Sequence, residues 1–244
     1  MKSSSAIGSE PQALASLLAL LVLGTSTDPN DLRTSETQLS SYEAQFHSHE
    51  SSEVRPWTAY AHIALPGKAE PVPLPPAHHH SETAVRTLAI IRLKHAIDRY
   101  WRGVRVIPKN RGNAQHGLTT VKIIDEDKTT LRSLLLENVL FEKNRGIALQ
   151  ASVCISKIAR TDFPSNWPDL FEKSLNALHQ AASHVITAMS STAFSPASED
   201  ARLEENALVT LRAAEVAKRS VKELSAVKIV SGKVRMAEVS LFVC

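Results

Sequence analysis

The sequence predicts an all-α protein in which antiparallel helix hairpins stack side by side. Composition is the first observation: 43% of the 244 residues are hydrophobic, 5% are aromatic, and glycine occurs 8 times. An all-β sandwich needs many turns and aromatic strand residues, so this composition argues against one. Periodicity is the second observation, because apolar residues recur at helical spacing through most of the chain.

The first predicted helix covers residues 9–24. Its apolar run, ALASLLALLVL, is too short to span a bilayer, which needs about 20 apolar residues. Ser9 can cap this helix, and Pro11 suits its first turn. A second interpretation stays open, in which residues 1–24 form a cleaved signal peptide of a secreted helical protein.

A second amphipathic helix follows directly. Asp28 can serve as its N-cap and Pro29 as its first residue. The short turn between the helices makes residues 1–46 one αα-hairpin. Its apolar residues fall near one face of the second helix: Leu32, Leu39, Tyr42 and Phe46.

Residues 47–80 interrupt the helical pattern. They contain six of the twelve prolines and the histidine run 78–80. Such a proline density is expected to exclude helix, and the PVPLPP stretch is typical of an extended polyproline segment. Three adjacent histidines have no carboxylate or cysteine at ligand spacing, so we expect a disordered insert and no metal site.

Helical periodicity resumes at residue 81. The segment 81–102 is predicted as a helix, followed by a glycine-broken loop insert at 103–124 with a short extended piece near 118–124. Asp125 starts another helix, whose acidic first turn is favourable. The apolar positions of the first of these helices are Val85, Leu88, Ile91, Leu93, Ala96, Ile97, Tyr100 and Trp101.

The clearest helix covers residues 144–160. Its apolar residues recur at i, i+4, i+7, i+8 and i+11, and the sequence DFPSNWPDL then breaks the helix. Ser165 or Asn166 can cap the next helix, and Pro168 fits its first turn. The recurring apolar positions are Ile147, Ala151, Cys154, Ile155 and Ile158. Cys154 is expected to be a small buried hydrophobe rather than half of a disulfide.

A last long helix is predicted over roughly residues 200–226, and the tail 227–244 is ambiguous between helix and strand. In the second half, hairpins repeat at roughly 40 residues, the period of HEAT or armadillo repeats. One hairpin cannot bury its apolar face alone. The predicted fold class is therefore a HEAT/armadillo-type α-solenoid with disordered inserts, in which residues 81–226 supply the later repeats.

Two segments resemble a known family. VRTLAIIRLKHAIDRYW (residues 85–101) is similar to the N-terminal signature of the importin-β, or karyopherin, superfamily. ISKIARTDFPSNWPDLF (residues 155–171) resembles the helix–break–helix that follows it, and DFPxxWPxL is the distinctive part. Within the superfamily, LKHAIDRYWR is most similar to the importin-eleven branch. Both motifs occur in the expected order.

The resemblance implies a nuclear transport receptor that acts in cytoplasm and nucleus and at the nuclear pore. Its implied partners are the small GTPase Ran in its GTP form, FG-repeat nucleoporins and protein cargo. No nucleic acid, membrane insertion, cofactor or metal is implied. Family members bind Ran chiefly through the inner B helix of each N-terminal repeat. Carried over to this sequence, the candidate Ran-binding residues are Arg33, Glu36, Arg86, Lys94, His95 and Asp98.

The sequence also departs from the family pattern. The A helix expected before residue 81 is missing from the predicted elements, residues 103–124 look like extra sequence, and far fewer repeats are present than in full-length relatives. We therefore hypothesise a truncated or mis-spliced product, in which 47–80 and 103–124 are inserted sequence.

Other function classes are weighed against this interpretation. The chain has no Gly-rich phosphate loop, GxSxG or HExxH motif, so we expect no enzyme. A net charge of +3 does not predict nucleic-acid binding. A solvated helix face explains Lys94, His95 and Asp98 as well as a binding role does. A generic HEAT scaffold without Ran sensing is the first alternative, and Trp101 and Trp167 are expected in the core in either case.

Overall fold

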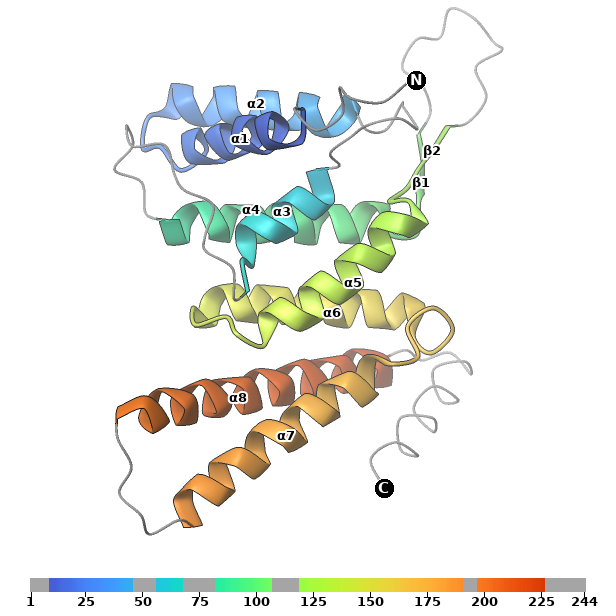
Figure 1. Cartoon of the computed structure of the whole chain (residues 1–244). Coiled ribbons are helices and arrows are strands. Elements are labelled where there is room, and N and C mark those ends of the chain that lie inside the picture. The colour runs from blue at the N-terminus through green and yellow to red at the C-terminus, as the bar shows by residue number, and fades with distance from the viewer. Residues whose placement is uncertain (1–8, 46–55, 68–81, 107–118, 191–196, 227–244) are drawn as a thin grey trace, which may run out of the picture. The chain divides into compact units, whose positions relative to one another are not determined.

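A computed structural model describes residues 9–45, 56–67, 82–106, 119–190 and 197–226. These residues form eight helices and two short strands (Figure 1). They divide into two compact units. The first unit includes residues up to Leu131 except 67–70, and the second unit includes 67–70 and the chain from Arg132 onward. The all-α prediction is confirmed. None of the described helices is both long and apolar enough to cross a membrane.

The first unit begins with the predicted hairpin of α1 (Ser9–Leu23) and α2 (Pro29–Gln45). The backbone N–H of Asn30 donates to Asp28 Oδ1 over 2.8 Å, so Asp28 is the start signal that the sequence indicated. Among the α1 side chains that the structure describes, the buried apolar ones are Leu17, Leu18, Leu21 and Val22. Removal of residues 1–24, as the signal-peptide alternative requires, would take all of these out of the core.

The apolar face predicted for α2 is partly wrong. Leu39 is fully buried as predicted, but 41% of Leu32 is exposed, and Phe46 lies outside the described residues. The residue that α2 buries near Leu32 is Ser35, whose hydroxyl donates to the Leu20 carbonyl over 2.8 Å. A satisfied hydroxyl is compatible with burial, so α2 and α1 approach each other closely through a polar residue that periodicity would not select.

The segment 47–80 contains a helix, α3 (Pro56–Ala64), so the prediction of a disordered insert is wrong for this part. Seven α3 residues are buried, including Trp57, Tyr60 and Ile63. Proline does not prevent this helix because Pro56 is its first residue, where no intrahelical N–H is needed, and Pro66 follows its end. The remainder of 47–80, including the histidine run, lies outside the described residues.

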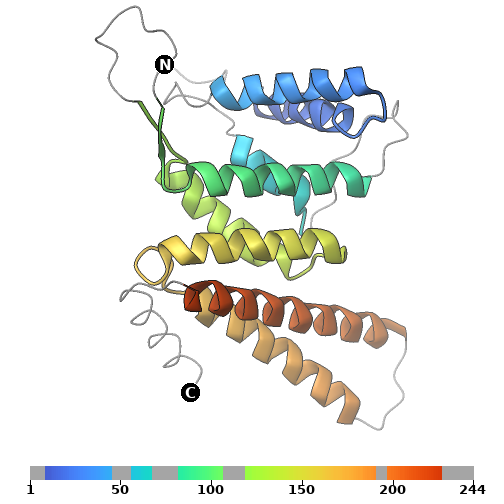
Figure 2. The same ribbon diagram turned by 180° about the vertical axis from the view of Figure 1, so that it is seen from behind.

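Helix α3 packs against α4 (Glu82–Tyr100) in the first unit, and Figure 2 shows the same pair from behind. The rings of Trp57 and Tyr100 are 5.8 Å apart between centroids. The partner helix that the sequence interpretation found missing is therefore α3. Residues 56–66 belong to the first unit, and α3 within them is largely buried, so this part of 47–80 is a core element and not a disordered insert.

The predicted loop insert at 103–124 is also partly ordered. Val104–Val106 (β1) and Thr119–Val121 (β2) pair antiparallel, with Val104 opposite Val121. The extended piece predicted near 118–124 corresponds to β2, whereas β1 was not predicted. Residues 107–118 between the strands lie outside the description.

The division between the units falls in α5 (Asp125–Val139), which starts at the predicted residue with three acidic residues in its first turn. In the second unit, α6 (Arg145–Asp162) is capped by Asn144, whose side chain accepts from the N–H groups of Gly146 and Ile147. Every apolar residue predicted for α6 is fully buried, and Cys154 is one of them.

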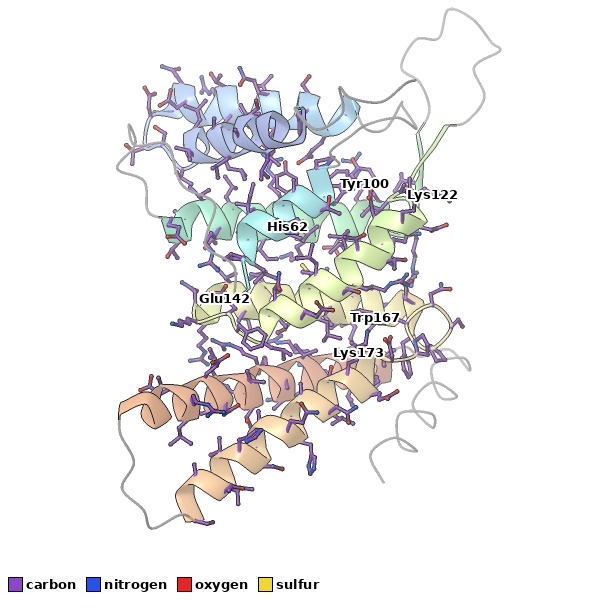
Figure 3. The ribbon with its side chains drawn as sticks, in the orientation of Figure 1. His62, Tyr100, Lys122, Glu142, Trp167 and Lys173 are labelled. Carbon is purple, nitrogen blue, oxygen red and sulfur yellow. The ribbon has the colours of Figure 1, made fainter. Side chains whose placement is uncertain are left out.

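The break after α6 begins where predicted, but the next helix starts later. Helix α7 covers Leu170–Ser190, and the N–H of Lys173 donates to the Asp169 carbonyl over 2.9 Å. Pro168 therefore precedes the helix instead of forming its first turn. Trp167, labelled in Figure 3, is 4% exposed and Trp101 is 3% exposed, so both predicted core tryptophans are confirmed.

Helix α8 covers Ala197–Ser225 and packs against both α6 and α7. It begins a few residues earlier than predicted. Two buried or half-buried arginines link helices of the second unit through hydrogen bonds. Arg212 on α8 donates to the carbonyls of Glu142 and Lys143, and Arg132 on α5 donates to the Asp162 carboxylate at 3.0 Å. The tail 227–244 lies outside the described residues.

Candidate protein-binding surface on α2 and α4

All of the candidate residues lie in the first unit, on two helices. Arg33 and Glu36 are on α2, and Arg86, Lys94, His95 and Asp98 are on α4. These are the second helices of the α1–α2 and α3–α4 pairs. The charged candidates therefore lie on equivalent helices of two consecutive pairs. The apolar side of α4 packs inward, and its buried residues are Val85, Ala89, Ile90, Leu93, Ala96 and Ile97.

A groove lies between α2 and α4. Its volume is about 410 Å³. Arg33 and Glu36 line it, so the structure brings these two candidates to one concave surface. The other residues that line the groove are Gly24, Leu32, Ser35, Thr37, Leu39, Leu88 and Arg92. The groove thus combines leucine side chains with charged groups at its rim.

Gly24 permits the close approach of the helices at one end of this groove. A Cβ added there would lie 2.8 Å from Leu88 Cδ2 and 2.8 Å from Ser35 Oγ. Both distances are below the normal range for a Cβ contact. The α1–α2 turn can therefore pack against α4 because residue 24 carries no side chain.

Arg92 connects α2 to α4 beside the groove. Its guanidinium forms an ion pair with Glu36 and lies 3.7 Å from a carboxylate oxygen of Glu43. The Tyr60 hydroxyl of α3 donates to Glu43 over 2.9 Å. Burial raises the pKa of Glu43, while the Tyr60 hydrogen bond and the charges of Arg92 and His95 oppose that rise. The network joins three helices of the first unit through charged groups and the Tyr60 hydroxyl.

The candidate residues on α4 differ in their contacts and in their exposure to solvent. Arg86 Nε donates to the Ala64 carbonyl at the end of α3 over 3.1 Å, and its guanidinium lies 3.7 Å from Glu82. Arg86 therefore helps to hold α3 against α4. His95 and Asp98 are exposed, and Lys94 is half-buried. Lys94 and Asp98 are one helical turn apart and share a side of α4.

Sequence reasoning missed Arg92, Leu32 and Leu88 as site residues. Arg92 is one of several charged residues of α4, and 56 positions separate it from Glu36. No local spacing rule relates residues so far apart. Leu32 and Leu88 were assigned to the core by their periodicity, yet both line the groove.

A second hollow, of about 660 Å³, lies within the second unit. Phe141 and Lys143 of the α5–α6 connection line it together with Glu204 and Leu208 of α8. Glu142 of the same connection is labelled in Figure 3. In the part of the chain that the structure describes, no group of three or more His, Cys, Asp or Glu side chains could hold a metal ion.

No protein-family model matches this chain. It is similar to Importin-11 of Homo sapiens, at 42% identity over 93 residues, which is 38% of this chain and 8% of that relative. It is 34% identical over 97 residues to the Importin beta-like protein KAP120 of Saccharomyces cerevisiae, again 8% of the relative. It is 31% identical over 111 residues to Exportin-2 of Danio rerio, which is 46% of this chain and 10% of that relative.

The chain therefore spans about a tenth or less of the length of these relatives. The relatives include both importins and exportins, so the comparisons support a role in the nuclear transport receptor family without distinguishing import from export. With the described helices they imply a HEAT-type α-solenoid, the fold class that the sequence predicts. The similarity to these relatives, over about two fifths of the chain, supports an importin-β family N-terminal region.

Proposed function

We propose that this chain binds Ran in its GTP form through α2 and α4 and takes part in the nuclear import of protein cargo. One observation carries the proposal: all candidate residues lie on the second helices of two consecutive pairs, and a groove lined by two of them separates these helices. The candidate surface comprises Arg33, Glu36, Arg86, Lys94, His95 and Asp98.

The proposed mechanism is selection between two shapes of the GTPase. A helical surface whose side chains are already held in place can contact one conformation of a switch loop better than another. A ligand discriminates between two states only through such differential contacts. The ion pairs of Arg92 and Arg86 hold part of this surface before any partner binds.

The remaining parts of the proposed role come from the family. They are binding of cargo and of FG-repeat nucleoporins, and passage between cytoplasm and nucleus through the pore in the nuclear envelope. This role requires no catalytic residue and no cofactor. It also requires no nucleic acid and no membrane insertion.

Calorimetry tests the proposal. The purified chain is titrated with Ran loaded with a non-hydrolysable GTP analogue and, separately, with Ran–GDP. We expect binding of the GTP form tighter than about 10 µM, near −7 kcal/mol, and at least tenfold weaker binding of the GDP form. Equal affinity for both forms, or no binding by a chain that melts cooperatively, would contradict the proposal.

One matched pair of variants tests the surface. Lys94 is half-buried on α4, and Lys218 is exposed on α8 in the second unit. Lys94→Glu is expected to weaken binding of Ran–GTP about tenfold, because it reverses a charge on the proposed contact surface. Lys218→Glu makes the same chemical change elsewhere and should leave the affinity within about twofold.

A generic HEAT scaffold remains the second candidate, and the hollow of the second unit favours it. Phe141 and Leu208 beside charged Lys143 and Glu204 could take a peptide without any role for a GTPase. Nucleotide dependence separates the two functions, because a plain scaffold has no reason to distinguish Ran–GTP from Ran–GDP.

A further inference from the structure

The connection between α4 and α5 concentrates the positive charge of the chain. Residues 99–124 contain six Lys or Arg residues and no Asp or Glu. The rest of the chain holds the other 22 of the 28 Lys and Arg residues and all 25 Asp and Glu residues, a net charge of −3. Lys109 and Arg111 lie outside the described residues. The other four cations lie at the base or on the strands of the β1–β2 ribbon: Arg99, Arg102, Arg105 and Lys122.

Both ends of this ribbon are fixed to the end of α4. The N–H groups of Gly103 and Ile123 donate to the Tyr100 carbonyl over 3.2 and 3.0 Å. Beside the strands, Trp101 is 3% exposed and Ile123 is 1% exposed. Gly103 has a φ of 84°, which favours glycine and lets the chain turn from α4 into β1. The ribbon therefore projects from a packed base at the end of α4 (Figures 1 and 2).

The cations at this base are open to solvent. Arg99 and Lys122 are exposed, and neither forms an ion pair among the residues that the structure describes. The Arg99 guanidinium lies 5.3 Å from the centre of the Tyr100 ring, a contact that leaves its positive charge in place. Figure 3 shows Tyr100 and Lys122 at the same end of α4. A partner that carries carboxylates would pair with these charges.

The ribbon also has open edges. It consists of β1 and β2, and among the described residues no third strand pairs with either of them. The outward N–H and C=O groups of an edge strand can pair with a further strand. An extended peptide supplies the matching backbone groups, and strand addition to an exposed sheet edge is a general mode of peptide recognition.

Nucleic acid fits this site less well. Single-stranded nucleic acids bind basic surfaces by stacking their bases on aromatic rings that are free to receive them. The two aromatic residues of the segment are already packed. Trp101 is buried, and the Tyr100 ring lies 5.8 Å from the Trp57 ring between centroids and also contacts Arg99. The chemistry of the site therefore favours an acidic peptide.

We infer that the β1–β2 ribbon binds an extended acidic segment of a partner protein, which adds a strand to the ribbon while its carboxylates pair with the cations at the base. The inference does not depend on the proposed function. It involves neither the groove between α2 and α4 nor the nucleotide state of a GTPase.

Fluorescence anisotropy of the full-length chain with two labelled peptides tests this inference. Both peptides carry six glutamates. In (Glu-Thr)6 the intervening residues favour a strand, whereas in (Glu-Pro)6 they lack the N–H that strand pairing needs. We expect (Glu-Thr)6 to bind at least about fivefold more tightly than (Glu-Pro)6, and more tightly than a labelled oligouridine of the same length. Raising the salt concentration from about 50 to about 500 mM should weaken binding, because it screens exposed charges.

A matched pair of double variants locates the site. Arg99→Glu with Lys122→Glu is expected to weaken binding of (Glu-Thr)6 at least about tenfold, because each exposed ion pair is worth up to about fivefold in an equilibrium constant. Arg202→Glu with Lys218→Glu makes the same changes at exposed positions of α8 and should leave the affinity within about twofold.

Three results would overturn the inference: equal binding of the two peptides, binding of the oligouridine as tight as that of (Glu-Thr)6, or unchanged binding by the Arg99→Glu, Lys122→Glu variant. Failure of (Glu-Thr)6 to bind a wild-type chain that melts cooperatively would overturn it as well.

Discussion

Arg212 shows how single residues hold the second unit together. Only 6% of it is exposed, and its Nε donates to the Glu142 carbonyl over 3.0 Å, while a second nitrogen lies 3.3 Å from the Lys143 carbonyl. Burial lowers the pKa of this arginine, and the charge of Glu142 opposes that effect. The guanidinium thus satisfies carbonyl groups of the α5–α6 connection and lies near a buried acid.

Replacing Arg212 should destabilise the chain strongly. Arg212→Met removes the hydrogen-bond donor of the Glu142 and Lys143 carbonyls. It also removes the positive charge near the Glu142 carboxylate, a residue that is only 5% exposed. We expect a loss of about 3–5 kcal/mol in the free energy of unfolding, measured by urea denaturation. Arg219→Met is the control on the same helix, because Arg219 is 34% exposed in its side chain and pairs with Glu215 one turn away.

The control is expected to cost at most about 1 kcal/mol, as exposed ion pairs usually do. Equal losses for Arg212→Met and Arg219→Met would show that the buried hydrogen bonds do not set the stability of this connection.

Residue-scale prediction from sequence succeeded where a local rule decides the outcome. Asp28 caps its helix as predicted, because a short polar side chain reaches the free N–H groups of the first turn. The pairing of Glu36 with Arg92 was not predicted, since it depends on how two helices meet. Leu32 was misplaced because periodicity selects a face and does not show whether another element covers it.

At the scale of elements, α3 shows that the local sequence pattern, and not the average composition of the segment, decides whether a helix forms. The segment 47–80 has many prolines overall, yet residues 57–65 contain none. Within α3, Trp57, Tyr60, Ala61 and Ala64 recur at helical spacing, and all are buried. The high proline content of the whole segment hides this short proline-free stretch, so the prediction is wrong for α3. By contrast α6 was predicted nearly to the residue, since its apolar repeat is long and the sequence DFPSNWPDL ends it.

A substitution pair tests α3 as a core element. Trp57 is 5% exposed and packs against Tyr60 and Tyr100, whereas His62 on the same helix is exposed. Trp57→Ala should lower the free energy of unfolding by about 3–5 kcal/mol, as loss of a buried large aromatic side chain does. His62→Ala should change it by about 0.5 kcal/mol or less.

Thermal melting monitored by circular dichroism measures both variants. If Trp57→Ala melted at the same temperature as the wild-type chain, residues 56–64 would not belong to the folded core, and the original prediction of a disordered insert would be restored.

At the scale of the whole molecule, each unit has its own buried core and its own hollow. The first unit carries the candidate residues and the groove between α2 and α4, and the second unit carries the hollow beside α8. The fold class could be predicted from composition, periodicity and repeat length. The groove could not, because its walls come from two helices whose lining residues are about fifty or more positions apart in sequence.

The central claim is that α2 and α4 together form a surface selective for Ran–GTP. Hydrogen–deuterium exchange of the full chain, alone and with each nucleotide form of Ran, tests it most directly. We predict slower amide exchange in residues 29–45 and 82–100 with the GTP form, no change with the GDP form, and none in α7 or α8 with either. Protection confined to α7 and α8, or the same protection with both forms, would contradict the account.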